Sequence, residues 1–148
     1  MGVIQTPDVA LNAATMQVTA ASVGPLTLAS SAGDTTMMSP SITTIGELVQ
    51  ITVGGTFYHA GADTNSEVLL QVVRDSSANV FAIAYPGGTN PIPANGGIVS
   101  ASWSFTDTPP PGAHTYAFIG AAAPINSLST WGDVLATNVS ASFTELRR

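Results

Sequence analysis

The residues best suited to acid–base chemistry are Asp107 and His114, which flank three consecutive prolines in the segment WSFTDTPPPGAHTYAFIG, residues 103–120. A carboxylate and an imidazole held together can act as acid and base, and hydrolysis by this route also needs an activated nucleophile. The chain has no Cys, and no Ser stands in a recognisable nucleophile motif. The sequence therefore favours a structural role or a ligand contact for both residues over catalysis.

The residues between this pair predict a stiff corner that joins two strands. Pro109, Pro110 and Pro111 fix φ and remove three backbone donors, so the segment cannot join a hydrogen-bonded ladder. Gly112 can adopt the left-handed conformation that starts the next strand. Tyr116 follows four residues later, where we expect its hydroxyl to tie the corner to the backbone.

Two aromatic residues are the candidate contacts for a glycan or a protein partner. Trp131 stands beside Gly132 in a loop-like segment, and Tyr85 ends a strand-like run just before the breaker-rich segment 86–97. Exposed aromatic rings offer a partner a large contact area at little conformational cost. Trp103, by contrast, is expected to face the core.

Metal and glycosidase chemistry have few candidate residues. His59 and His114 are the only histidines, whereas a transition-metal site usually has at least three protein ligands. A site shared between subunits through both histidines and Asp63 stays open as an alternative. The nine carboxylates are scattered along the chain, and glycoside cleavage needs two of them roughly 5–10 Å apart. We expect no metal, no cofactor and no catalytic residue.

Charge is scarce in this chain. Charged residues make up 8% of the 148 residues, against roughly 25% in ordinary soluble domains. There is no Lys, and with Arg147 and Arg148 set aside, residues 1–146 carry nine acids and one base (Arg74), a formal charge of −8. The chain therefore lacks the basic footprint of nucleic-acid binding and is not suited to anionic membranes. A neutral Ser/Thr/Asn surface suits packing against copies of itself or a larger particle, and the alternative is a secreted domain with a neutral surface.

The segments that carry these residues have the periodicity of β-strands. In residues 98–105 the apolar side chains alternate with serines, so one face is buried and the other is exposed. Gly54 and Gly55 are expected to break a neighbouring run. No segment repeats apolar residues with helical spacing, and short strands between Gly/Pro/Asn turns predict an all-β antiparallel sandwich. Further strands are expected at 48–53, 56–59, 68–74, 80–85, 113–119 and 134–146.

The chain divides into two unequal parts. Residues 1–40 are predicted to form an extended N-terminal arm with one or two short strands, at 16–19 and 26–28, and a loop over 30–40. Residues 41–148 are predicted to form the sandwich domain, with seven or eight strands. The Cys–Trp–Cys pattern of immunoglobulin domains is absent and the long connections fit crossings between sheets, so a jelly roll is favoured over an immunoglobulin-like sandwich.

The run DTPPPGAHTYAF, followed by a long loop and a closing strand that ends in VSASFTEL, resembles the last part of small β-sandwich proteins from tailed bacteriophage virions. In that family a strand ends in Asp-x-Pro-Pro-x-Gly and His-Thr-Tyr opens the next one. The resemblance covers residues 42–148. It implies a non-enzymatic structural role in the virion, as a head decoration or cement protein or as part of a fibre or tail tip.

Three roles follow, of which capsid decoration is favoured. This role implies a homotrimer that binds the major capsid protein or other virion proteins, made in the host cytoplasm and carried on the particle surface, without contact to nucleic acid or membrane. The alternative is a receptor- or glycan-binding module of a fibre or tail tip, with Trp131, Tyr85 and the segment 86–97 in contact with the ligand. An enzymatic role is the least supported, because no nucleophile or metal motif accompanies the candidate acid and base.

Overall fold

The structure is a computed structural model, and it describes residues 16–21, 24–29, 34–59, 66–85, 97–124 and 133–146. Within these residues the chain forms ten β-strands and no helix, so this part of the chain offers no helix that could cross a membrane. All of the strands predicted beyond residue 48 are present. The strands are β1 (Met16–Ala21), β2 (Leu26–Leu28), β3 (Thr35–Met38), β4 (Ser41–Thr44), β5 (Val49–His59), β6 (Ser66–Arg74), β7 (Ala78–Tyr85), β8 (Ile98–Asp107), β9 (Gly112–Pro124) and β10 (Val134–Glu145).

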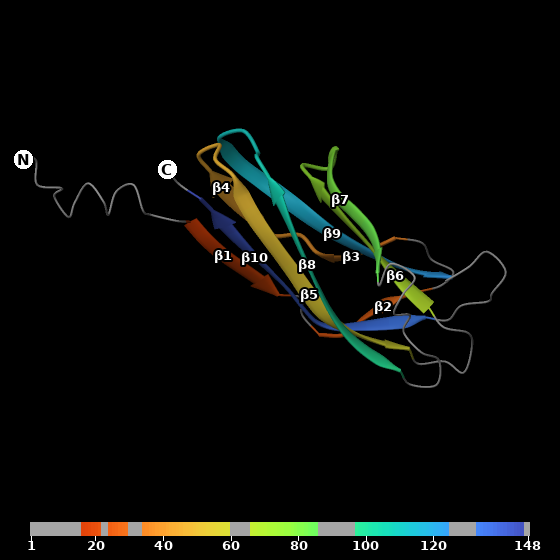
Figure 1. The fold of residues 1–148 in the computed structure, drawn as a ribbon. Helices are drawn as coiled ribbons and strands as arrows, with labels where there is room; N and C mark the ends of the chain where they lie inside the picture. The colour runs from red at the N-terminus through yellow and green to blue at the C-terminus, as the bar shows by residue number, and fades with distance from the viewer. Residues whose placement is uncertain are drawn as a thin grey trace, which may run out of the picture.

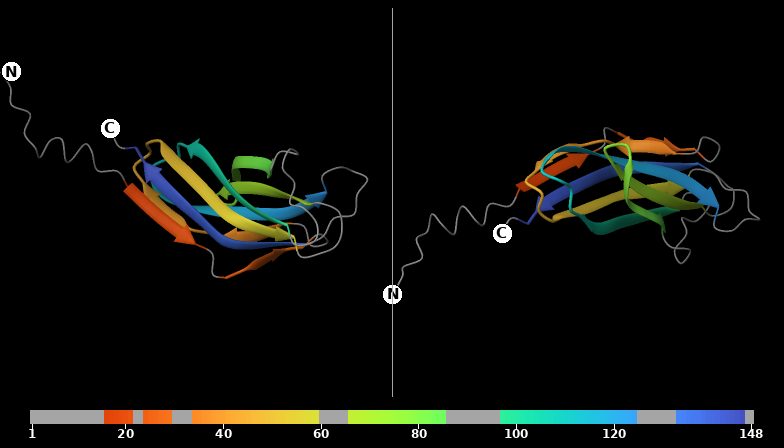
Figure 2. Two further views of the ribbon diagram at one scale, coloured as in Figure 1. Left: turned by 60° about the horizontal axis from the view of Figure 1, so that its bottom comes forward. Right: turned by 90° about the horizontal axis from the view of Figure 1, so that it is seen from above.

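The strands form two antiparallel five-stranded sheets that pack face to face (Figure 1). Sheet A has the order β1-β10-β5-β8, with β2 also paired to β10, and sheet B has the order β3-β9-β6-β7, with β4 also paired to β9. Figure 2 shows the same two layers from two further directions. The predicted all-β antiparallel sandwich is confirmed.

The strands pair in an order that runs from the two ends of the chain towards its middle. β1 and β2 pair with β10, β3 and β4 pair with β9, β5 pairs with β8, and β6 pairs with β7. The pairs β5–β10 and β6–β9 then complete the two sheets. The chain is thus laid out as one long antiparallel hairpin that is wound into two layers.

Aromatic side chains from both sheets fill the space between the layers. Phe143 of sheet A meets Phe118 of sheet B edge to face, with ring centroids 6.0 Å apart, and Phe57 meets Trp103 in the same way at 5.9 Å. Trp103 is buried and the serines that alternate with it are exposed. The core face predicted for residues 98–105 is therefore the face that packs against the core.

Three strands lie in the part of the chain for which an arm was predicted. β1 and β2 occupy the two positions where short strands were expected, but β3 lies where the sequence predicts a loop. Leu28 of β2 and Met37 of β3 are buried members of the core. The described residues before position 40 are therefore built into the two sheets. The division into an arm at residues 1–40 and a domain at residues 41–148 stays a prediction, and residues 1–15 lie outside the described residues.

The expected break at Gly54 and Gly55 is absent, and β5 runs through both glycines in unbroken register with β8. The irregularity lies in the neighbouring strand β10, where the register shifts between Thr137 and Ser140 and Asn138 adopts a φ of 53°. A Cβ on Gly54 would lie 3.0 Å from the carbonyl oxygen of Ala101. This glycine serves close packing of adjacent strands, because any side chain would meet backbone.

Candidate functional site

Polar side chains gather at the end of the sandwich where β8 leads into β9. We call Arg74, Asp75, Asp107, His114 and Tyr116 the corner cluster. Arg74 ends β6, Asp75 opens the β6–β7 turn, Asp107 ends β8, and the other two lie near the start of β9. The antiparallel register of β6 with β9 places Arg74 directly opposite Tyr116.

The proline-rich segment sets the geometry of this corner. β8 ends at Asp107 and β9 begins at Gly112, whose φ of 136° lies in the region that favours glycine. The three prolines between them donate no backbone hydrogen bonds, but their carbonyl groups still accept. The carbonyl of Pro110 accepts from two side chains, Thr44 Oγ1 at 3.3 Å and His114 Nε2 at 2.7 Å.

Asp107 is the acceptor at the buried side of the corner cluster. Its Oδ2 accepts from Arg74 Nη1 and, at 2.8 Å, from the hydroxyl of Tyr116, while Oδ1 accepts from the backbone N–H of Thr108 at 2.9 Å. Tyr116 is fully buried, and this burial, with the hydrogen bond to Asp107, raises the pKa of Tyr116 above its ordinary value. Tyr116 thus remains a donor, and it ties the corner to a side chain rather than to the backbone.

His114 and Asp75 form the second half of the corner cluster. His114 Nδ1 lies 2.6 Å from Asp75 Oδ2, and the other carboxylate oxygen accepts from the backbone N–H of Thr115 at 2.9 Å. The hydrogen bond to Asp75 raises the pKa of His114, against an opposing effect of burial. The same bond, with the one from Thr115, lowers the pKa of Asp75.

Asp107 and His114, considered as an acid–base pair from the sequence, take different partners in the structure. Both ring nitrogens of His114 are engaged, and Asp107 is bound to Arg74 and Tyr116. Their hydrogen bonds connect the β6–β7 turn with the β8–β9 corner. Arg74 and Asp75 were not singled out from the sequence, although Arg74 is the one base before position 147.

A second polar contact fastens the same end of the sandwich. Glu145, at the end of β10, is fully buried, and its Oε1 accepts from the backbone N–H groups of Ile45 at 2.9 Å and Glu47 at 3.3 Å. These residues lie in the β4–β5 turn, and Thr44, the last residue of β4, donates to the carbonyl of Pro110. The β4–β5, β6–β7 and β8–β9 turns and the last strand are therefore connected by side-chain hydrogen bonds.

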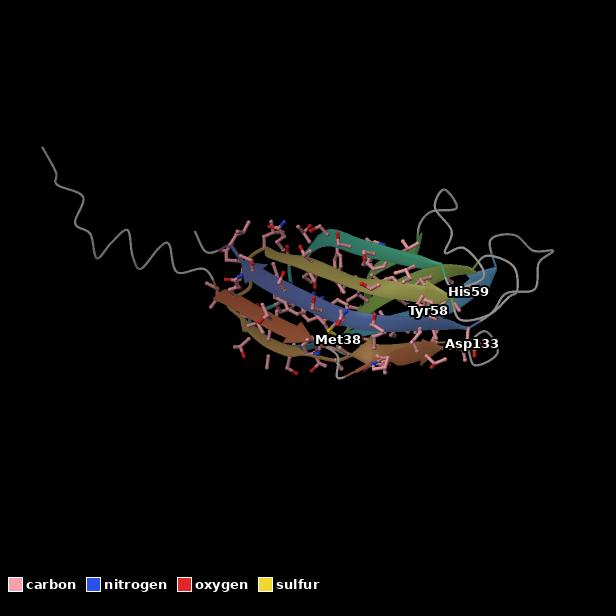
Figure 3. All side chains as sticks on the ribbon, turned by 90° about the horizontal axis from the view of Figure 1, so that it is seen from below. Met38, Tyr58, His59 and Asp133 are labelled. Carbon is pink, nitrogen blue, oxygen red and sulfur yellow. The ribbon has the colours of Figure 1, made fainter. Side chains whose placement is uncertain are left out.

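Most of the remaining candidate residues lie outside the described part of the chain, and among them is Asp63. Trp131 lies outside the described residues, and so does most of the segment 86–97; Tyr85 is the last residue of β7, and its side chain is likewise not described. His59 is fully buried at the end of β5 far from the corner, where Figure 3 shows it beside Tyr58. In the described part of the chain, no group of three or more His, Cys, Asp or Glu side chains is arranged to hold a metal ion.

No family model matches the chain, and no curated protein matches it in sequence. Among solved structures, the VP2 subviral particle of infectious bursal disease virus has a TM-score of 0.54 at 9% identity, over 88% of this chain and 33% of that one. T=1 particles derived from infectious bursal virus give a TM-score of 0.55 at 12% identity, over 88% and 31% of the two chains. The chain thus spans about a third of the length of these proteins. At such low identity the likeness concerns the fold.

Proposed function

We propose that this chain is a non-enzymatic structural protein of a virion, with a jelly-roll fold. The observation that supports this proposal most directly is the strand order of the two sheets. When β1 with β2 and β3 with β4 each count as one position, the two sheets have the orders 1-8-3-6 and 2-7-4-5. This is the order of a long hairpin wound into two four-position layers, as in jelly rolls of viral capsids. The fold likeness to structures of virus particles supports the same role.

Within that role we propose decoration or cementing of a tailed-phage head by a homotrimer that binds the major capsid protein. The scarcity of charge supports this assignment, because removing a neutral surface from water costs less than burying charged groups. The mutual hydrogen bonds of Asp107, His114 and Tyr116 with other groups of the protein support a non-enzymatic role. The alternative is a glycan-binding module of a fibre or tail tip, in which Trp131 and Tyr85 contact the sugar.

The edge strand β8 is the feature best suited to assembly. Among the described residues β8 is the last strand of sheet A, and it pairs with β5 in unbroken register from Asp107 to Ile98. Proteins usually protect such an edge with Lys, Pro or a bulge. β8 contains neither Lys nor Pro, and its outward side chains Ser100, Ser102 and Ser104 are small and exposed. We therefore place β8 at the contact between subunits.

A pair of matched lysine substitutions tests this contact. Ser102→Lys places a charge on the edge strand β8. Thr52→Lys places the same charge on the same outer face, but on the neighbouring interior strand β5. We expect light scattering to show an oligomer for the natural chain and for Thr52→Lys, and a monomer for Ser102→Lys. An oligomer in all three proteins would refute assembly through β8. Loss of the oligomer in both variants would indicate that the contact lies on the outer face of sheet A.

Binding to particles tests the function itself. The purified protein is added to phage heads that lack it, and bound copies are counted by electron microscopy. Regular, saturable binding supports decoration. The opposite outcome is a monomer that does not bind particles but binds glycans. If Trp131→Ala then abolishes glycan binding without a change in melting temperature, the recognition role would replace decoration.

A further inference from the structure

We propose that the doubly protonated ring of His114 is a clamp that holds the β6–β7 turn against the β8–β9 corner and opens when the pH rises. This inference does not depend on the role in a virion. It rests on the atoms that the ring faces, on the charges around it and on the position of the two turns.

The partners of the ring fix its protonation state. Nδ1 faces the Asp75 carboxylate at 2.6 Å, and Nε2 faces the carbonyl oxygen of Pro110 at 2.7 Å. Neither oxygen can donate a hydrogen bond. A neutral imidazole has one N–H, so it would satisfy one of these acceptors and turn a lone pair towards the other. Only the imidazolium donates to both.

The clamp joins two segments that lie far apart in the sequence. Asp75 and Ser76 form the β6–β7 turn with φ values of 52° and 60°, and Pro110 lies in the corner, which has no backbone donors at its three prolines. His114, with 10% of its side chain exposed, lies between them. Loss of one ring proton removes either the bond to the turn or the bond to the corner, and so breaks the link through His114. The bonds from Thr115 to Asp75 and from Arg74 to Asp107 remain, so the change is confined to the contact between the turn and the corner.

The charged groups around the ring favour its charged form. Asp75 from the β6–β7 turn stabilises the imidazolium, and Arg74 from β6 opposes it. Asp107 from β8 is bound to Arg74, and Tyr116 from β9 donates to Asp107. With His114 charged, the cluster has two cations and two carboxylates. With His114 neutral it carries one excess negative charge, in a chain whose formal charge is already −6.

The pH range of the clamp follows from the directions of two shifts. The pKa of His114 is raised, so the clamp is fully closed below the ordinary histidine value of about 6.5 and opens as the pH rises through the higher folded-state value. The pKa of Asp75 is lowered, so this carboxylate stays charged as the pH falls well into the acid range. The clamp is therefore closed at mildly acidic pH and opens on the alkaline side of the ordinary histidine value.

Nitrogen and proton NMR of the two histidine rings tests the clamp in the natural chain, with His114→Gln used to assign the signals. We expect His114 to keep both ring protons at pH 6.5 and to titrate at a higher pH. We also expect the backbone amides of residues 75–77 to shift with the same midpoint. A ring that is neutral at pH 6.5, or turn amides that do not follow the titration, would refute the clamp. The titration itself is followed in the natural chain, and the variant serves for the assignment alone.

Asp75→Asn provides the matched variant. Asn tolerates the left-handed φ of this position, its side-chain oxygen can still accept from Thr115, and its NH₂ group can donate to an unprotonated ring nitrogen. We expect the His114 midpoint to fall by at least one pH unit in this variant. An unchanged midpoint in a folded Asp75→Asn protein would show that Asp75 does not hold the ring in its charged form.

Discussion

Replacement of Tyr116 by Phe removes one oxygen atom and tests how much the corner cluster contributes to stability. The hydroxyl is fully buried and donates to Asp107 at 2.8 Å. A hydrogen bond to a charged group contributes about 1.5–3 kcal/mol. Asp107 keeps Arg74 and the backbone N–H of Thr108 as donors in the variant, so we expect the free energy of unfolding to fall by about 2 kcal/mol, in the lower part of that range.

Urea denaturation of Tyr116→Phe and of a control, Tyr58→Phe, measures this loss. Tyr58 lies on the outer face of sheet A and is partly exposed, so its hydroxyl should contribute no more than about 0.5 kcal/mol. A cycle with Asp107→Asn, singly and combined with Tyr116→Phe, isolates the pairwise energy. A loss below about 0.5 kcal/mol for Tyr116→Phe, or strict additivity in the cycle, would contradict the role that we assign to this bond.

Two further predictions concern the core and the N-terminal segment. Phe143→Ala should lower the free energy of unfolding by about 3–5 kcal/mol, because the ring is fully buried against two other aromatic rings; a loss near 1 kcal/mol in urea denaturation would contradict this packing. Deletion of residues 1–40 should abolish cooperative unfolding, because it removes β1, β2 and β3 with their core side chains, whereas deletion of residues 1–15 should preserve it. Equal stability of the two truncated chains by circular dichroism would show that β1–β3 do not support the sandwich.

Local patterns in the sequence predicted most strands of this sandwich and their buried faces, because strand periodicity is a property of neighbouring residues. The Ser alternation from Val99 to Phe105 marks a strand that is buried on one face, and the structure confirms it. β3 was missed since the run Thr35–Met38 is too short to show a period. The break expected at Gly54 was wrong because a glycine in a strand has two uses, to bend the chain or to allow close approach, and the sequence does not distinguish them.

The hydrogen-bond partners in the corner cluster could not be predicted from the sequence. Asp107 and Arg74 are 33 residues apart, and His114 and Asp75 are 39 apart. These contacts depend on the register between β6 and β9, and a slip of one residue would turn Arg74 and Tyr116 to opposite faces. The one available signal was the scarcity of bases. A carboxylate that is buried near the end of a strand has few possible partners in a chain with one Arg before position 147.

The outer face of sheet A shows how the scarcity of charge bears on the assembly that we propose. Register places Thr19, Ser142, Thr52 and Ser104 in one row across β1, β10, β5 and β8, and Thr52 and Ser104 share a hydrogen bond of 2.7 Å. The rows on either side are also uncharged. Such a face loses little on dehydration because its hydroxyl groups can bond to one another.

A neutral face and an unprotected edge meet along β8, and they favour different contacts. Pairing through the edge continues the sheet into a second subunit, whereas packing through the face stacks two sheets. Edge pairing needs the backbone groups of β8, which ends this side of sheet A among the described strands. Face packing uses central side chains such as Thr52. The lysine variants at Ser102 and Thr52 therefore separate the two geometries, because a charge on β5 disturbs stacking and spares an extended sheet.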